Sequence, residues 1–211
     1  MFLPCLATAS AVLDFEGPLP GGLTPTSFFQ GAVVPSSARV TDQFLSQGVV
    51  ISNAAVVAGG IGHSASGVNS LAGVDSSGQI NYDQAVSFSF YEAGDLARPA
   101  TTDFFAYSAD LGGGSGNTIT ISAFDEVDTL IGQVSYLESG TFASPLVLSG
   151  FGQFHRITVD QTLIDTQSGG IMIDLVQFGD IVPLGAVPEP GSLGLTLLAV
   201  IALVRAKKCL K

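Results

Sequence analysis

The chain has 211 residues and a formal net charge of −11, yet only 12% of its residues are charged. This length suits one ordinary domain with short processing segments. Four of the seven basic residues lie in the last seven positions, so residues 12–182 contain three basic and 17 acidic residues. No basic patch is left to displace the counterions of a nucleic acid, which excludes that class of partner. The excess of acids fits either a bound cation such as calcium or a domain that charge keeps soluble.

Residues 1–11 resemble the end of a secretory signal peptide, because 7–9 and 9–11 both read small-x-small. A basic n-region is missing, so we expect the true start to lie upstream. The alternative is a short buried strand. Cys5 and Cys209 both fall in segments that we expect to be removed, so the mature protein would contain no disulfide.

Residues 12–182 consist of short apolar runs, several of them alternating, separated by Gly-, Ser- and Pro-rich turns. No amphipathic helix is apparent between these runs. Half-exposed strands of this kind predict one all-β domain, an antiparallel β-sandwich of the jelly-roll type. The expected strands are 13–16, 49–52, 86–91, 104–108, 118–124, 130–136, 146–149, 154–159 and 171–178.

Residues 183–211 differ from the rest of the chain. A Val-Pro-Glu-Pro segment precedes an apolar stretch that basic residues close. About 13 apolar residues are fewer than the roughly 20 of a comfortable membrane span, but a thinned bilayer accommodates a short one. We expect a single short transmembrane helix with its basic end in the cytoplasm. The motif is Val187, Pro188, Glu189 and Pro190; the anchor is Leu193, Leu195, Leu197, Leu198, Val200, Ile201, Leu203 and Val204; the basic end is Arg205, Lys207 and Lys208.

This three-part tail resembles the PEP-CTERM sorting signal of Gram-negative bacteria over residues 187–208. The resemblance implies recognition by an exosortase-type membrane peptidase and transient anchoring in the inner membrane. It also implies a final place on the cell surface or in the matrix, with exopolysaccharide and biofilm. One departure is Arg-Ala-Lys-Lys in place of an arginine run. A terminal helix packed on the domain is disfavoured, because the stretch has no polar face.

Segments 13–17, 44–51, 63–71 and 173–178 resemble the jelly-roll carbohydrate-binding modules that often precede such tails. In those modules a Glu near the first strand and an Asp in the last strand share a structural calcium. The resemblance therefore implies that Glu16 and Asp174 bind calcium. The alternative is that both carboxylates point to solvent at strand ends.

Catalytic signals are weak. His63 lies in a Gly-Ile-Gly-His-Ser loop and His155 within an expected strand, and no Gly-x-Ser-x-Gly elbow, zinc pattern or phosphate-binding loop is present. The acidic run 125–128 is read as a turn rather than a calcium loop. We therefore expect a non-enzymatic protein that contacts exopolysaccharide, with a structural or adhesive protein and a polysaccharide hydrolase or lyase as alternatives. Sugar-stacking candidates are Tyr82, Tyr91, Tyr107 and Tyr136.

Overall fold

The computed structural model describes residues 11–59, 65–110, 117–137, 145–162 and 172–184. Within these residues we find no helix with the length and hydrophobicity to cross a membrane. The expected transmembrane helix 193–204, the motif 187–190 and His63 all lie outside the described residues.

The described residues form an all-β fold of thirteen strands, with antiparallel pairing throughout the strands. Two short 3-10 turns, Pro20–Gly22 and Leu45–Gln47, are the helical elements of these residues. The strands are β1 (Ala11–Leu13), β2 (Arg39–Val40), β3 (Val49–Ser52), β4 (Ala54–Ala58), β5 (Asn69–Gly73), β6 (Val86–Glu92), β7 (Asp95–Asp110), β8 (Thr118–Phe124), β9 (Leu130–Leu137), β10 (Leu146–Phe154), β11 (Arg156–Thr162), β12 (Met172–Phe178) and β13 (Val182–Pro183).

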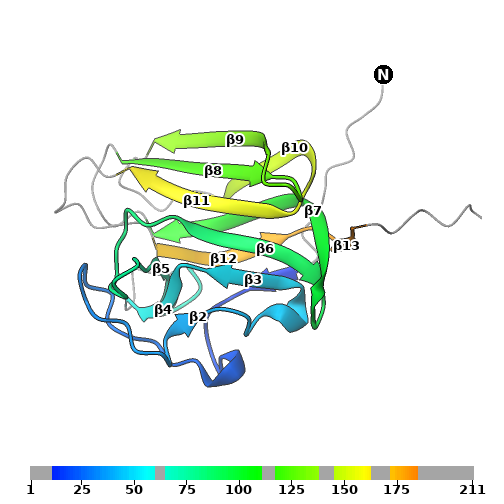
Figure 1. The fold of residues 1–211 in the computed structure, drawn as a ribbon. Coiled ribbons are helices and arrows are strands. Elements are labelled where there is room, and N and C mark those ends of the chain that lie inside the picture. The colour runs from blue at the N-terminus through cyan, green and yellow to red at the C-terminus, as the bar shows by residue number, and fades with distance from the viewer. Residues whose placement is uncertain (1–10, 60–64, 111–116, 138–144, 163–171, 185–211) are drawn as a thin grey trace, which may run out of the picture.

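The strands are arranged as two facing layers, which are hydrogen-bonded to each other through β7 (Figure 1). The front sheet has the order β3-β6-β11-β8-β9, and the back sheet has the order β2-β4-β5-β12-β7-β10. Strand β7 begins in a hairpin with β6 and then runs between β12 and β10 in the back sheet. Strand β1 lies beside β12. The fold is therefore a sandwich-like all-β structure, as expected.

The main core lies between the two sheets and follows from period-two alternation. In β6 the side chains of Phe88 and Phe90 are buried, while the intervening serines are half-buried. Phe88 packs against Phe105 of β7 with ring centroids 5.1 Å apart, and Phe90 packs against Phe178 of β12 at 5.4 Å. Aromatic pairs of this geometry join the front sheet to the back sheet.

A second, smaller core covers the outer face of the back sheet. Ala55 and Val57 of β4 point into it, while Ala54 and Val56 point into the main core. Both faces of β4 are thus buried, which removes the alternation of polar and apolar residues that identifies a strand in sequence. This is why the sequence did not predict β4.

Most expected strands are confirmed, with three corrections. The first strand is Ala11–Leu13 rather than 13–16. The stretch 154–159 is not one strand, because a bend at His155 separates β10 from β11. Phe154 pairs with β7 of the back sheet, whereas Arg156 pairs with β6 and β8 of the front sheet. His155 therefore marks the place where the chain crosses between sheets. The third correction is β7, which starts nine residues before the expected 104.

Candidate functional site

Strands β1 and β12 bring together two carboxylates that are far apart in sequence. Ala11 pairs with Phe178 and Leu13 with Val176, so β1 lies on the same side of β12 as β5, whose Leu71 pairs with Ile173. The end of β1 and the start of β5 therefore meet near the middle of β12. The first and last long strands of the domain thus lie side by side.

Glu16 fastens the segment that leads into β5. Its Oε1 accepts hydrogen bonds from the N–H groups of Val68 at 2.7 Å and Asn69 at 2.6 Å, and its Oε2 accepts one from the Asn69 amide at 3.3 Å. Gly67 lies so close that a Cβ there would come within 2.8 Å of the Glu16 carboxyl carbon. The glycine thus permits the carboxylate to approach the backbone.

Asp174 holds the same segment from β12 and is fully buried. Its Oδ2 accepts from Ser66 N–H at 2.6 Å, and its Oδ1 accepts from Ser66 Oγ at 3.1 Å and Leu175 N–H at 2.7 Å. Leu175 has a positive φ of 45°, at the register shift in the pairing of β12 with β7. The alternative that Asp174 points to solvent is wrong. We call Glu16, Asp174 and the segment 66–69 the carboxylate latch.

Calcium binding by the latch stays a prediction. Calcium takes six to eight oxygen ligands, and the oxygens of Glu16 and Asp174 accept hydrogen bonds from N–H and O–H donors of the segment 66–69. Among the described residues no three His, Cys, Asp or Glu side chains are grouped for a metal. The observed hydrogen bonds join the segment 66–69 to both β12 and the chain that follows β1.

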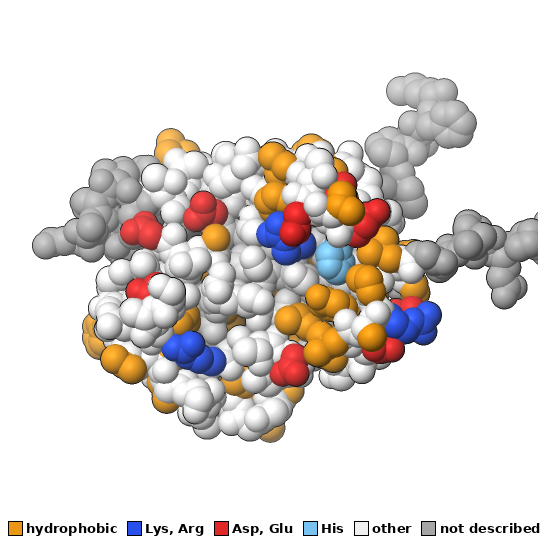
Figure 2. All heavy atoms as spheres, viewed as in Figure 1, with side chains coloured by type: hydrophobic (Ala, Val, Ile, Leu, Met, Phe, Trp, Pro, Cys, Tyr) orange, Lys and Arg blue, Asp and Glu red, His pale blue; other side chains and the backbone are white. Residues whose placement is uncertain are grey.

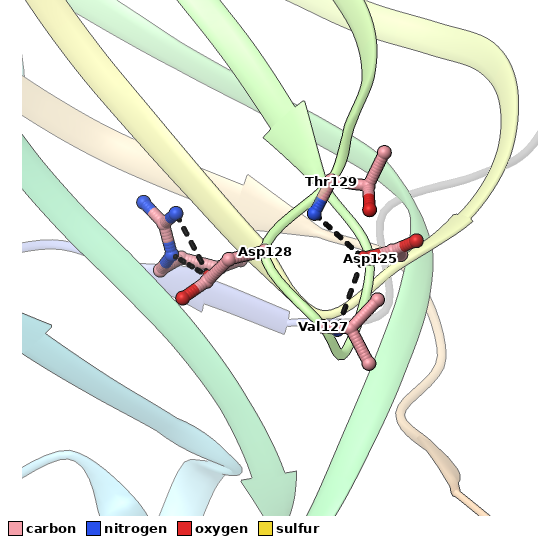
Figure 3. A network of polar contacts seen from close by, with 5 residues as sticks. Asp125, Val127, Asp128 and Thr129 are labelled. Carbon is pink, nitrogen blue, oxygen red and sulfur yellow. Dashed lines mark hydrogen bonds and ion pairs between the residues drawn. The ribbon is translucent and has the colours of Figure 1, made fainter.

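The acidic run 125–128 forms a turn between β8 and β9, as expected (Figure 3). Asp125 Oδ1 accepts hydrogen bonds from Val127 N–H at 3.0 Å and Thr129 N–H at 2.8 Å. Asp128 has a φ of 63° and forms an ion pair with Arg156 at 2.9 Å. The Arg156 guanidinium also lies 4.0 Å from the centroid of the Phe124 ring. These carboxylates therefore serve the turn and its neighbouring strand.

His155 is held in place by structural contacts. Its Nδ1 lies 2.8 Å from the carbonyl oxygen of Ala100, and its ring meets Tyr91 edge to face at 5.5 Å. Tyr82 and Tyr107 are buried, so two of the four tyrosines do not present a face to solvent. The Tyr136 hydroxyl is bonded to Val147. Tyr91 and Tyr136 are half-buried, so part of each side chain is open to solvent.

A polar cleft that the sequence did not predict opens at the β2–β4 edge of the back sheet. It has a volume of about 350 Å³ and lies between the segments 39–41, 52–54 and 74–76, with Gln84 beside them. Its lining combines buried Val40, Ala54 and Val74 with exposed hydroxyl and amide side chains. The sequence signal was Arg39, one of three arginines in an acidic domain, but only the fold places it beside the turns at 53 and 75.

Arg39 differs from the other arginines of the described residues. Arg98 pairs with Glu92 at 2.6 Å and Arg156 pairs with Asp128, whereas Arg39 has no ion-pair partner among the residues that the structure describes. Figure 2 shows how few Lys and Arg side chains lie on the face in view, and how far apart they are. An unpaired guanidinium in an acidic protein is available for an anionic group.

Asp75 also lines the cleft, and its carboxylate stabilises the turn that it begins. Its Oδ1 accepts from Ser77 N–H at 2.9 Å, Ser77 Oγ at 2.7 Å and Gln79 N–H at 3.0 Å. The Gln79 and Ser77 hydrogen bonds lower the pKa of this carboxyl below its usual value. Asp75 is therefore ionised at neutral pH and stiffens one wall of the cleft.

No protein-family profile and no curated protein matches the chain. Among solved structures, the enzymatically active domain of tailspike protein 4 from bacteriophage CBA120 is similar over 73% of this chain. The identity is 14% and the TM-score is 0.35. The similar region spans 22% of the length of that tailspike chain.

Proposed function

We propose that this protein is an exported, non-enzymatic surface or matrix protein whose β-sandwich, of the jelly-roll type, contacts exopolysaccharide. The observation that carries the proposal is the order of segments in 187–208: a Pro-Glu-Pro motif, an apolar stretch and a basic end. That order suits a membrane peptidase of the exosortase type, because the prolines keep the motif extended next to the membrane. The protein is anchored in the inner membrane until the tail is removed.

The polar cleft supports a binding role over a catalytic one. A glycoside hydrolase uses two carboxylates on either side of the scissile bond. The one carboxylate in the cleft lining is Asp75, and one of its oxygens already accepts three hydrogen bonds. The hydroxyl, amide and guanidinium groups of the lining suit the binding of a sugar rather than its cleavage.

Deletion of residues 187–211 tests the export part of the proposal in the producing cell. We expect the deletion to abolish envelope retention and processing, and the wild-type protein to have an intact mass that shows cleavage near 187–190. Deletion of 209–211 is the matched control, since it leaves the motif, the anchor, Arg205 and Lys208 in place. An uncleaved wild-type mass with an unchanged distribution of the longer deletion would refute export by this route.

Affinity for the organism's own exopolysaccharide tests the binding part, with polymer length measured alongside. We expect the full chain to be retained by the intact polymer and polymer length to stay constant. A fall in chain length on incubation would show a hydrolase or lyase. Absence of retention would favour a structural or adhesive role instead.

A further inference from the structure

The polar cleft is framed by backbone contacts that fix its shape. Val74 N–H donates to the carbonyl oxygen of Asn53 at 2.9 Å, so the turn after β3 is held against the end of β5. Arg39 pairs with Ala55 in the β2–β4 ladder, which fixes the third wall. Asn53 has a positive φ of 58°, which turns the chain sharply between β3 and β4. A site with fixed walls loses little entropy when a ligand binds.

The lining offers mainly polar contacts. Val40, Ala54 and Val74 are at most 5% exposed and pack into the two cores, so they present little apolar surface to the cleft. The hydroxyl and amide groups of the lining are on exposed or half-buried side chains, so their water is displaced at modest cost. The hydroxyl groups of a pyranose ring exchange hydrogen bonds with side chains of this kind. The exposed or half-buried polar groups are Thr41, Ser52, Asn53, Ser76 and Gln84.

Arg39 would favour a sugar that carries a carboxylate over a neutral sugar. Its guanidinium lies against Gly78, which closes the turn that Asp75 stabilises, and Arg39 itself lines the cleft. A guanidinium binds a carboxylate through two parallel N–H···O bonds, an arrangement that neutral hydroxyls do not reproduce. The surrounding domain is strongly acidic, and Arg39 still has no carboxylate partner among the described residues.

We infer that the polar cleft binds a uronic acid residue of an acidic polysaccharide, with the carboxylate on Arg39 and the sugar hydroxyls on the neighbouring polar groups. This inference rests on the proposed polysaccharide contact and names its chemistry. The volume of about 350 Å³ is near the lower end for small-molecule sites, so the cleft holds a short saccharide unit. The rest of the polymer lies outside it.

The test uses the purified full chain in buffer with 0.15 M salt, with digalacturonate as the probe and galactobiose as its neutral counterpart. We expect saturable binding of digalacturonate by calorimetry, and at least tenfold weaker binding of galactobiose. Arg39→Gln is expected to reduce affinity for digalacturonate at least tenfold, and Arg39→Lys to restore part of it. Arg98→Gln is the matched control and should change the affinity by less than twofold, because Arg98 pairs with Glu92 outside the cleft.

Thermal melts of the variants verify that Arg39→Gln remains folded, which is expected because the Arg39 side chain is exposed. Equal affinity for the two disaccharides, no binding of digalacturonate, or full affinity in folded Arg39→Gln would overturn the cleft assignment. Retention of the wild type on the native polymer with no loss in Arg39→Gln would also overturn it, while leaving the proposed function intact. Digalacturonate binding that Arg39→Gln abolishes, without retention on the native polymer, would support the cleft and refute the wider proposal.

Discussion

The hydroxyl group of Tyr136 donates a hydrogen bond to the carbonyl oxygen of Val147 at 2.7 Å and accepts one from the N–H of the same residue at 3.1 Å. Tyr136 lies on β9 and Val147 on β10, the edge strands of the front and back sheets. One side chain thus satisfies both backbone groups of an edge residue. This contact joins the two sheets at an edge that would otherwise be open to pairing with another chain.

Replacement of Tyr136 with Phe should therefore destabilise the protein although the ring is kept. We expect Tyr136→Phe to lower the free energy of unfolding by about 1–2 kcal/mol, because two backbone groups lose their partner. Urea denaturation followed by fluorescence or circular dichroism measures the change. Tyr91→Phe is the matched control and should stay within about 0.5 kcal/mol, since Tyr91 contacts His155 through its ring. Equal effects of the two substitutions would contradict the role of the Tyr136 hydroxyl.

The same substitution at Tyr107 should have the opposite effect. The Tyr107 hydroxyl is buried and has no hydrogen-bond partner among the described residues. Removing a buried unsatisfied hydroxyl is expected to leave stability unchanged or raise it by up to about 1 kcal/mol at neutral pH. A clear loss of stability in Tyr107→Phe would show that the hydroxyl has a partner.

Tyr107 should also make the protein sensitive to alkali. Burial raises the pKa of its hydroxyl far above the ordinary value of 10.0. Below pH 10 both folded and unfolded states keep the proton; above it the unfolded state ionises first, so stability falls by up to about 1.4 kcal/mol per pH unit. We expect Tyr107→Phe to reduce this slope between pH 10 and 11, as measured by denaturant midpoints. An unchanged slope would refute the assignment to Tyr107.

The carboxylate latch predicts a large effect of an isosteric change at Asp174. In Asp174→Asn the NH₂ group must face either Ser66 N–H or Leu175 N–H, which are both donors. We expect a loss of about 2–3 kcal/mol in unfolding free energy, since hydrogen bonds to a charged group are the stronger ones. Asp14→Asn removes an exposed carboxylate two residues from Glu16 and should change stability by less than about 0.5 kcal/mol. A neutral Asp174→Asn would argue against the latch.

Chelation distinguishes the latch from a calcium site. Because the latch is held by hydrogen bonds, we expect the melting temperature in EDTA to match that in 1 mM calcium to within about 1 °C. A melting temperature that rises with calcium, and that no longer does so in Asp174→Asn, would show that Glu16 and Asp174 bind the cation after all.

The sequence predicted strands well where one face is buried and the other is solvated. The stretches 49–52 and 118–124 coincide with β3 and β8. In β8 threonines alternate with buried isoleucines, and β3 ends at an exposed serine. It failed at β4 and β5, where Ala, Gly and Val are buried on both faces. It failed again at His155, since a crossing between sheets depends on partners in both sheets, and those partners are distant in sequence.

For the candidate site, too, some features follow from the sequence and others only from the tertiary structure. The sequence by itself determined the acidic charge of the domain, its β-rich character and the segmented tail at 187–208, because these depend on composition and local order. It also suggested that Glu16 and Asp174 would meet. Tertiary structure alone decided what the carboxylates contact, because the donors at 66–69 arrive through the pairing of β5 with β12. Tertiary structure alone also forms the polar cleft, because its walls come from three segments that only the back sheet brings together.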